Sequence, residues 1–259
     1  MKIAASDYDG TLFRNDTITA ADAQSVQRWR EAGHKFGVVT GRDYGMLAPQ
    51  LEHYGIGYDY AVCNNGAIIC QSDGTPLWEG RIEPRILKAI SEIPEVRRSF
   101  HFAFSAATQT YLCHEFEGSW IAREGRQWDF PVIDIEEKDI LSLPQVHQFS
   151  LGYETPEESL AASQVVNAKY GEYVHAFPNR CSLDITPHGI SKSEGIEHLM
   201  ELMHWDPATT EVYCIGDEIN DLPMIKAYNG FTVETARDEI KAQARQAYAS
   251  VGAMLEANI

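Results

Sequence analysis

Two acidic residues separated by one position stand near the start of the chain, within Ile3-Ala4-Ala5-Ser6-Asp7-Tyr8-Asp9-Gly10-Thr11-Leu12. The apolar and small residues before them are typical of a short buried strand, in which residues two apart point to the same side. We therefore expect the carboxylates of Asp7 and Asp9 to start on one face, near enough to share a cation or a proton. Two like charges that close are unfavourable unless a metal or a shifted pKa compensates them.

An alternative interpretation of this stretch is a polar turn after a strand. Asp and Gly are common in turns, and Gly10 allows the backbone to bend sharply. The acidic pair alone leaves both interpretations open, so the rest of the chain has to supply the partners that chemistry would need.

Three further polar clusters fall at comparable places in the predicted elements. They are Thr40, Gly41 and Arg42 after one strand, Lys192 at the start of a helix, and Asp217, Asn220 and Asp221 after a later strand. Each cluster alone is explained by turn formation or, for the lysine, by a solvated surface. Because ligands of open α/β sheets bind outside the carboxyl ends of the strands, all the clusters together indicate an anion site with a metal.

The elements that must position these residues alternate between strands and helices. Before residue 82 we expect strands at 3–6, 35–40 and 60–64, helices at 19–33 and 43–53, and a hairpin of 67–70 with 75–78. After residue 187 we expect a helix at 191–203 opened by a capping box, strands at 211–216 and 230–233 with a helix between them, and a last helix at 236–249. This order predicts a doubly wound, Rossmann-like parallel-sheet core.

Between these segments the pattern changes to adjacent strands with few helices. We expect helices at 84–93 and 156–170 and strands at 100–105, 110–115, 132–135, 146–153, 173–177 and 182–185. Such an order favours an antiparallel α+β unit. The predicted organisation is therefore an α/β core formed by 1–81 and 188–259, with an α+β domain inserted at 82–187.

Composition restricts the partners. A net charge of −17 over 259 residues makes binding to nucleic acid or to an anionic membrane unfavourable, so a phosphate site needs local cations. No apolar run has the length of a membrane helix, and Asp7 interrupts any signal-peptide core, so we expect a cytoplasmic protein, monomeric or a small homo-oligomer. The five cysteines have irregular spacing, and we expect buried reduced thiols.

The four clusters resemble, in order, the motifs of the haloacid dehalogenase-like phosphatases. The chain matches them at Asp7-Tyr8-Asp9-Gly10-Thr11, at Thr40-Gly41-Arg42, at Lys192 and at Gly216-Asp217-Glu218-Ile219-Asn220-Asp221. The long insert after the second motif, preceded by Asn64-Asn65-Gly66-Ala67, resembles the Cof-type, sugar-phosphatase-like subgroup with an α/β (C2-type) lid. The resemblance covers both segments of the predicted core.

This resemblance implies a role for each matching residue. Asp7 is the expected nucleophile, Asp9 the acid and base, and Lys192 the third catalytic residue. The implied ligands of Mg²⁺ are Asp7, Asp9 through its backbone carbonyl, Asp217 and Asp221. The implied phosphate-binding residues are Gly10, Thr40, Gly41, Arg42, Asn65 and Asn220. The expected reaction is hydrolysis of a small phosphorylated metabolite, a sugar phosphate first, through an aspartyl phosphate.

Two alternatives to this function remain open at this point. A phosphotransferase or phosphomutase would use the same aspartyl phosphate but pass the phosphoryl group to a sugar hydroxyl. A non-catalytic protein that binds a phosphorylated ligand would use the same scaffold without turnover. The polar residues that catalysis needs are all present, which favours an enzyme.

Overall fold

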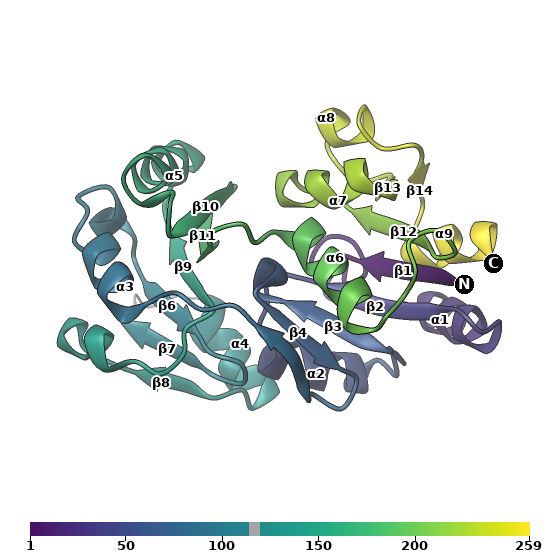
Figure 1. Ribbon diagram of the computed structural model, residues 1–259, viewed down its shortest axis with the longest axis horizontal. Helices are drawn as coiled ribbons and strands as arrows, with labels where there is room; N and C mark the ends of the chain where they lie inside the picture. Colours follow the sequence, from purple (N-terminus) through teal and green to yellow (C-terminus); the bar gives the residue numbers. More distant parts are fainter. Residues whose placement is uncertain (114–119) are drawn as a thin grey trace. The chain divides into compact units, whose positions relative to one another are not determined.

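A computed structural model describes residues 1–113 and 120–259 of the chain (Figure 1). These residues form two compact units, each with its own sheet. The first unit consists of Met1–Thr40, Ala48–Trp78 and Ser191–Ile259, and the second of Gly41–Leu47 and Glu79–Ile190.

The sheet of the first unit has eight strands in the order β14-β13-β12-β1-β2-β3-β4-β5. The strands are β1 (Lys2–Ser6), β2 (Lys35–Val39), β3 (Tyr60–Cys63), β4 (Ile68–Gln71), β5 (Pro76–Glu79), β12 (Glu211–Gly216), β13 (Asn229–Val233) and β14 (Ala247–Tyr248). The strands from β14 to β3 pair in parallel, and β4 is antiparallel to β3. Because β1 lies between β12 and β2, the strand order reverses there, which is where open α/β sheets bind ligands.

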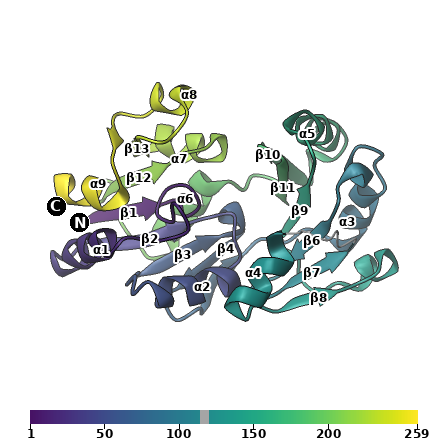
Figure 2. The same ribbon diagram turned by 180° about the vertical axis from the view of Figure 1, so that it is seen from behind.

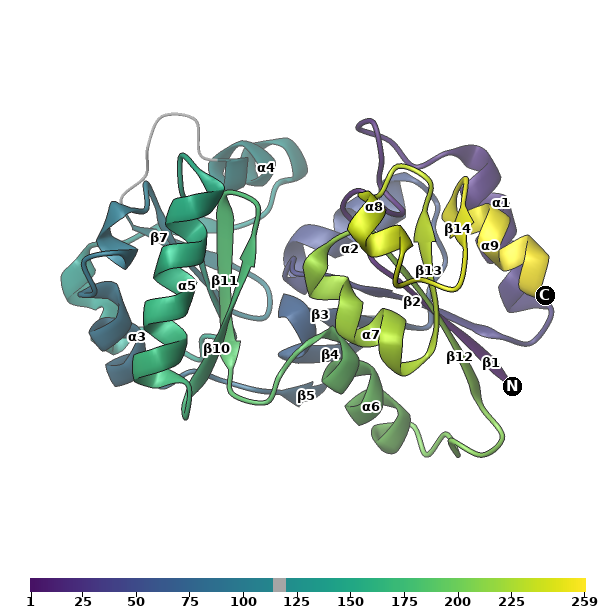
Figure 3. The same ribbon diagram turned by 90° about the horizontal axis from the view of Figure 1, so that it is seen from above.

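Helices cover both faces of this sheet (Figure 3). They are α1 (Ala20–Glu31), α2 (Tyr44–His53), α6 (Lys192–Leu202), α7 (Leu222–Ala227), α8 (Asp238–Lys241) and α9 (Val251–Asn258). Strand β12 shows the two-sided burial: Val212 and Cys214 join the apolar cluster of α6 and α7, whereas Tyr213 meets Trp29 of α1 with ring centroids 5.8 Å apart. The predicted doubly wound core is confirmed.

The C-terminal region differs from the prediction of one helix at 236–249. The structure has the short helix α8 there, followed by β14, and α9 begins only at Val251. Ala247 and Tyr248 pair in parallel with Thr232 and Val233, and Tyr248 also packs against Phe231. Sheet pairing and ring packing therefore outweigh the helix propensity of this alanine-rich stretch.

The second unit contains a six-stranded sheet in the order β10-β11-β9-β6-β7-β8 (Figure 2). Its strands are β6 (Phe102–Ser105), β7 (Thr110–Cys113), β8 (Val132–Asp134), β9 (Gln148–Gly152), β10 (Val174–Asn179) and β11 (Ser182–Pro187), and its helices are α3 (Pro84–Ser91), α4 (Trp120–Trp128) and α5 (Pro156–Tyr170). The predicted antiparallel pattern fails at β8, which pairs with β7 in parallel, because a connection containing α4 separates the two strands. Residues 114 and 115 of the expected strand 110–115 lie outside the described residues.

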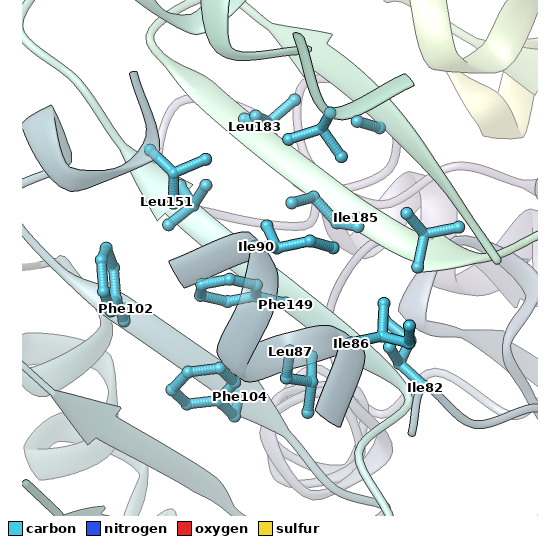
Figure 4. Close-up of a cluster of buried hydrophobic side chains, with 14 of the residues drawn as sticks. Ile82, Ile86, Leu87, Ile90, Phe102, Phe104, Phe149, Leu151, Leu183 and Ile185 are labelled. Carbon is cyan, nitrogen blue, oxygen red and sulfur yellow. The ribbon is translucent and has the colours of Figure 1, made fainter. Parts of the chain in front are cut away.

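An apolar core fills one face of this second sheet (Figure 4). Phe149 and Leu151 of β9 pack there with Leu87 of α3. Because side chains alternate along a strand, Gln148 and Ser150 lie on the opposite face. Each fully buried aliphatic or aromatic side chain stabilises the unit by about 1.5–3 kcal/mol. The second sheet therefore has one apolar face and one face that carries polar groups.

Residues 41–47 group with the second unit, and the domain division at 1–81, 82–187 and 188–259 stays a prediction. Gln148 Nε2 donates to the Gly41 carbonyl at 2.9 Å, and Thr110 Oγ1 donates to Asp43 Oδ2 at 3.1 Å. These bonds come from β9 and β7, which are distant in sequence. The main insert spans Glu79–Ile190, where the sequence predicted 82–187.

The cysteines are free thiols, four of them buried and Cys181 half-buried. The prediction of buried thiols therefore fails only at Cys181. Within residues 1–113 and 120–259, no helix combines the length and the apolar character that crossing a bilayer requires.

Candidate active site

The carboxyl ends of three neighbouring strands carry the polar residues that the sequence singled out. Asp7 directly follows β1, and its backbone N–H donates to Ile215 O in β12 at 2.9 Å. Thr40 directly follows β2, and its N–H donates to Val62 O in β3 at 2.8 Å. Asp217 directly follows β12. The parallel order β12-β1-β2 thus places Asp7, Asp217 and Thr40 at one edge of the sheet.

Three buried carboxylates gather at this edge. Asp7, Asp217 and Asp221 each offer an oxygen, and these atoms lie within 4.8 Å of one another. Asp221 is held by two backbone donors, because its Oδ2 accepts the N–H of Asp217 at 2.9 Å and the N–H of Glu218 at 3.0 Å. Its Oδ1 is left to face the lysine of α6.

Lys192 is the cation at the centre of this cluster. Its side chain is 2% exposed, and Nζ donates to Asp7 Oδ1 and to Asp221 Oδ1, each at 2.6 Å. Such charge-assisted bonds are shorter and stronger than neutral ones. The lysine is the first residue of α6, and Ser191 caps that helix by accepting the N–H of Ser193. The predicted helix start therefore delivers Lys192 directly to the acidic cluster.

The charges of the cluster are not balanced. Burial raises the pKa of Asp7 well above its ordinary value, and the neighbouring Asp221 adds to the shift. Burial, again followed by Asp221, raises the pKa of Asp217 to about 6. Burial alone would lower the pKa of Lys192, but the carboxylates of Asp221 and Asp7 outweigh it, and the pKa lies above its ordinary value. Lys192 is therefore held as the ammonium form.

These residues fit a divalent cation. Three carboxylates and one ammonium leave two uncompensated negative charges when every group is ionised. All of the ligand atoms are oxygens, which hard cations such as Mg²⁺ prefer. Because the excess charge is buried, an ion at this position would stabilise the ionised carboxylates that burial otherwise disfavours.

The turn after Asp7 is shaped around Asp217. Gly10 has a φ of +83°, and a Cβ added there would lie 2.5 Å from Asp217 Oδ2, so this position requires glycine. Thr11 Oγ1 donates to Asp217 Oδ1 at 2.9 Å. Thr11 was not among the predicted site residues, although its place in the first motif was a usable signal.

Asp9 lies in a different environment from Asp7. Strand β1 ends at Ser6, and the chain then turns, with the N–H groups of Thr11 and Phe13 donating to Tyr8 O at 3.3 and 2.8 Å. Strand alternation therefore does not extend to Asp9, which is exposed whereas Asp7 is buried. Among the described residues, the carboxylate cluster does not include Asp9. Its expected ligand atom was the backbone carbonyl, and its role stays a prediction.

Asn65 and Asn220 meet each other near the same edge. Asn220 Nδ2 donates to Asn65 Oδ1 at 3.2 Å, and the Asn65 N–H donates to Thr40 O at 2.9 Å. Asn65 has a φ of +53°, which asparagine tolerates better than most residues. The structure thus links the segment after β3 to the motifs after β2 and β12.

Gly41 and Arg42 belong to the second unit, so their contacts are given within that unit. Arg42 Nη1 forms an ion pair with Glu124 Oε2 at 2.8 Å, with side chains 9% and 17% exposed. No pattern in the sequence indicates that Glu124 is the partner of Arg42. The expected contribution of Gly41 and Arg42 to phosphate binding stays a prediction.

The site is thus the carboxyl edge of a parallel α/β sheet that holds three buried carboxylates and a lysine, groups suited to phosphoryl chemistry. A family model described as haloacid dehalogenase-like hydrolase matches residues 4–251. The chain belongs to this family of hydrolases and phosphatases, and the resemblance found in the sequence is confirmed.

Three known proteins are similar to this chain in sequence or in fold. It is 27% identical to YkrA of Bacillus subtilis over 93% of this chain and 89% of that protein. The name of YkrA assigns it provisionally as a phosphatase. This chain is 24% identical to the pyridoxal phosphate phosphatase YbhA of Escherichia coli, over 94% and 91% of the two chains. The solved structure of BT4131, described as a HAD subclass IIB sugar phosphatase, matches the fold with a TM-score of 0.76 at 19% identity, over 99% and 97% of the chains.

Proposed function

We propose that the protein is a Mg²⁺-dependent phosphatase that hydrolyses a small phosphorylated metabolite, with sugar phosphates as the first candidates. The observation that carries the proposal is the pair of bonds from Lys192 Nζ to Asp7 and Asp221, beside the third carboxylate of Asp217. Phosphoryl transfer depends mainly on positioning and charge neutralisation, and this cluster offers both.

In the proposed first step, a carboxylate oxygen of Asp7 attacks the phosphorus atom. A bond forms between this oxygen and phosphorus, the ester bond breaks, and Asp9 gives its proton to the leaving alkoxide. In the second step, Asp9 takes a proton from a water molecule that attacks the aspartyl phosphate and releases inorganic phosphate. The exposed position of Asp9 supports this role, because a proton donor must reach the substrate.

Lys192 orients the Asp7 carboxylate through its 2.6 Å bond and adds positive charge beside the phosphoryl group. Thr40 and the Asn65–Asn220 pair, at the same sheet edge, are the proposed partners of the phosphoryl oxygens. Asp7, Asp217 and Asp221, with the Asp9 backbone carbonyl, are the residues that would hold Mg²⁺. When bound, the ion neutralises phosphoryl charge so that a carboxylate can approach an anionic ester.

The second unit is the proposed source of substrate selection. The polar face of its sheet supports this role, because Ser150 Oγ donates to Asp184 Oδ1 at 2.7 Å and Gln148 Nε2 donates to Ser150 Oγ at 2.9 Å. This network combines hydroxyl, amide and carboxylate groups, the kinds of group that bind a polyhydroxylated substrate. If this proposal is correct, Asp184→Asn changes the order of preferred metabolites, whereas the rate on a small generic ester stays within about twofold.

The names of the relatives support a small substrate. One relative is named for pyridoxal phosphate and one structural neighbour for sugars, and both groups of substrates are small phosphate monoesters. The acidic charge of −17 agrees with a metabolite rather than nucleic acid or an anionic membrane as partner. We also propose a cytoplasmic location and a monomer or small homo-oligomer.

The test is a screen of phosphorylated metabolites for phosphate release, with Asp7→Asn as the inactive control. Release of inorganic phosphate from one group of metabolites by the wild type alone supports the proposal. A phosphorylated product without free phosphate would show that the protein is a phosphotransferase and not a phosphatase. Tight binding of a metabolite without turnover of any ester would show that the protein is a non-catalytic ligand sensor.

A further inference from the structure

A cavity with a volume of about 430 Å³ lies in the first unit. It opens between the last turns of α6, the segment that follows α6, and Tyr228 after α7. The phosphatase chemistry proposed above uses none of its lining residues. The volume falls within the range of cavities that hold small organic molecules.

Apolar and aromatic groups line the inner part of this cavity. Met200 is buried, and Trp205 and Tyr228 are half-buried, so each keeps some surface toward the opening. The Trp205 ring packs edge-on against Tyr60 with centroids 6.0 Å apart, which fixes its position. Two aromatic rings at one cavity provide π-faces that attract cations.

The outer part of the cavity is acidic. Glu197 and Glu201 are one helical turn apart on α6, and Asp206 follows the helix; all three are exposed. Among the described residues that line the cavity there is no lysine or arginine, and the basic group present is the imidazole of the exposed His204. By contrast, the half-buried Asp59 is paired with both Arg30 and Lys35.

In the part of the chain that the structure describes, no ion pair involves Glu197, Glu201 or Asp206. Like charges at i and i+4 of a helix disfavour each other, so a cation between Glu197 and Glu201 would relieve this repulsion. Burial, with the nearby Cys214 and Glu197, raises the pKa of Tyr228, so its ring stays neutral beside the acids.

We propose that this cavity binds a small organic cation: an ammonium group that carries a short apolar or aromatic chain. The ammonium would lie between the carboxylates of Glu197 and Glu201, and the apolar part would contact Met200, Trp205 and Tyr228. Neither an anion nor a phosphate ester suits this site, because the rim carries the same sign of charge. The site is thus separate in chemistry from the phosphatase centre.

The test uses three ligands of similar size in isothermal titration calorimetry. Phenethylamine is the cation at neutral pH, 2-phenylethanol its neutral analogue and 3-phenylpropionate an anion. The cation is expected to bind at least about fivefold more tightly than the alcohol. Its affinity should fall as the salt concentration is raised, and the anion is expected not to bind. Absence of heat with phenethylamine, or equal affinity for the alcohol, would overturn the proposal.

Two double variants locate the binding. Glu197→Gln with Glu201→Gln should weaken phenethylamine binding about fivefold or more. Glu157→Gln with Glu172→Gln makes the same change of net charge at exposed positions of the second unit and should leave the affinity unchanged. Circular dichroism verifies that both variants are folded, which is expected because all four side chains are on the surface.

An equal effect of the two double variants would show a general charge effect and reject the site. Concentration-dependent dimerisation of the wild type that the Glu197 and Glu201 changes abolish would assign the cavity to a second copy of the chain instead. Neither result depends on catalytic turnover, so this proposal and the phosphatase proposal fail independently.

Discussion

Lys192 Nζ and Asp221 Oδ1 lie 2.6 Å apart, and both side chains are almost completely excluded from solvent. This bond joins the start of α6 to the segment that precedes α7. The same Nζ also holds Asp7. Lys192 therefore maintains the arrangement of two carboxylates that would otherwise repel each other in a buried place.

Replacing Lys192 by methionine should destabilise the protein. Lys192→Met keeps the length of the side chain but leaves the buried carboxylates without their cation, which typically costs about 3–5 kcal/mol. Urea unfolding at neutral pH without divalent metal measures this change. As a control, Lys138→Met removes a lysine whose side chain is 72% exposed and should change stability by less than about 0.5 kcal/mol. Equal stability of the two variants would show that the Lys192 bonds contribute little.

Asp7→Asn should abolish turnover while the protein stays folded. The amide keeps the size of the carboxyl group but lacks the charge that attacks phosphorus. Folding should tolerate the change, because burial and Asp221 already raise the pKa of Asp7 and so disfavour its charged form. Steady-state phosphate release and circular dichroism measure the two properties. Substantial turnover in a preparation free of other phosphatases would contradict the nucleophile assignment.

Chelation should remove activity, and Mg²⁺ should restore it. Mg²⁺ should also raise the thermal midpoint of the wild type, because a ligand that binds only the folded state stabilises it. Asp217→Asn should weaken both effects, whereas Asp238→Asn, at an exposed residue outside the cluster, should leave them unchanged. Full turnover in excess chelator would be incompatible with a metal-dependent mechanism.

Asp9→Asn should affect esters according to their leaving groups. A sugar alkoxide needs a proton as its bond breaks, so its hydrolysis should slow by about a hundred- to ten-thousand-fold. Nitrophenolate needs little help, so the first step with nitrophenyl phosphate should persist, and a burst of nitrophenol should precede a slow steady rate. Rapid-mixing kinetics distinguish the two steps. An equal loss of the first step with both esters would mean that Asp9 is not the acid.

Asp43 should make stability depend on pH. It is 2% exposed, and burial raises its pKa from 3.8 to about 7 despite the bonds from Met46 N and Thr110. A carboxyl with a raised folded-state pKa contributes stability below its unfolded pKa, and this contribution is lost as pH rises through the folded value. Relative to wild type, Asp43→Asn should therefore gain stability between about pH 4 and pH 8 in urea unfolding. A difference that stays constant over this range would refute the assignment, and the exposed Asp238→Asn should show that constant difference.

The sheet edge could be predicted because it follows from local pattern. Apolar runs that end in Asp7, Thr40 and Asp217 mark strand ends, and parallel strands place their carboxyl ends together. The capping residue Ser191 likewise located the first residue of α6. These features depend on short stretches of sequence, and the structure places them as expected.

The features that were missed depend on contacts distant in sequence. Gln148 bonds to Gly41 and Thr110 bonds to Asp43, and no pattern near Gly41 in the sequence indicates either partner. In the same way, the pairing of Tyr248 with Val233 replaces the expected last helix. Strand alternation does not extend to Asp9, because β1 ends at Ser6, so its role stays a prediction.

The central position of β1 also has a consequence for biosynthesis. Asp7 is bonded to a lysine 185 residues later, and Thr11 to an aspartate 206 residues later. A ribosome that adds about 5–20 residues per second needs about 10–40 s to make Lys192 after Asp7. During that interval Asp7, the proposed nucleophile, lacks both the lysine and the neighbouring strand β12. We therefore expect translation products that stop before α6 to be inactive and to expose one edge of β1 to the chaperone machinery.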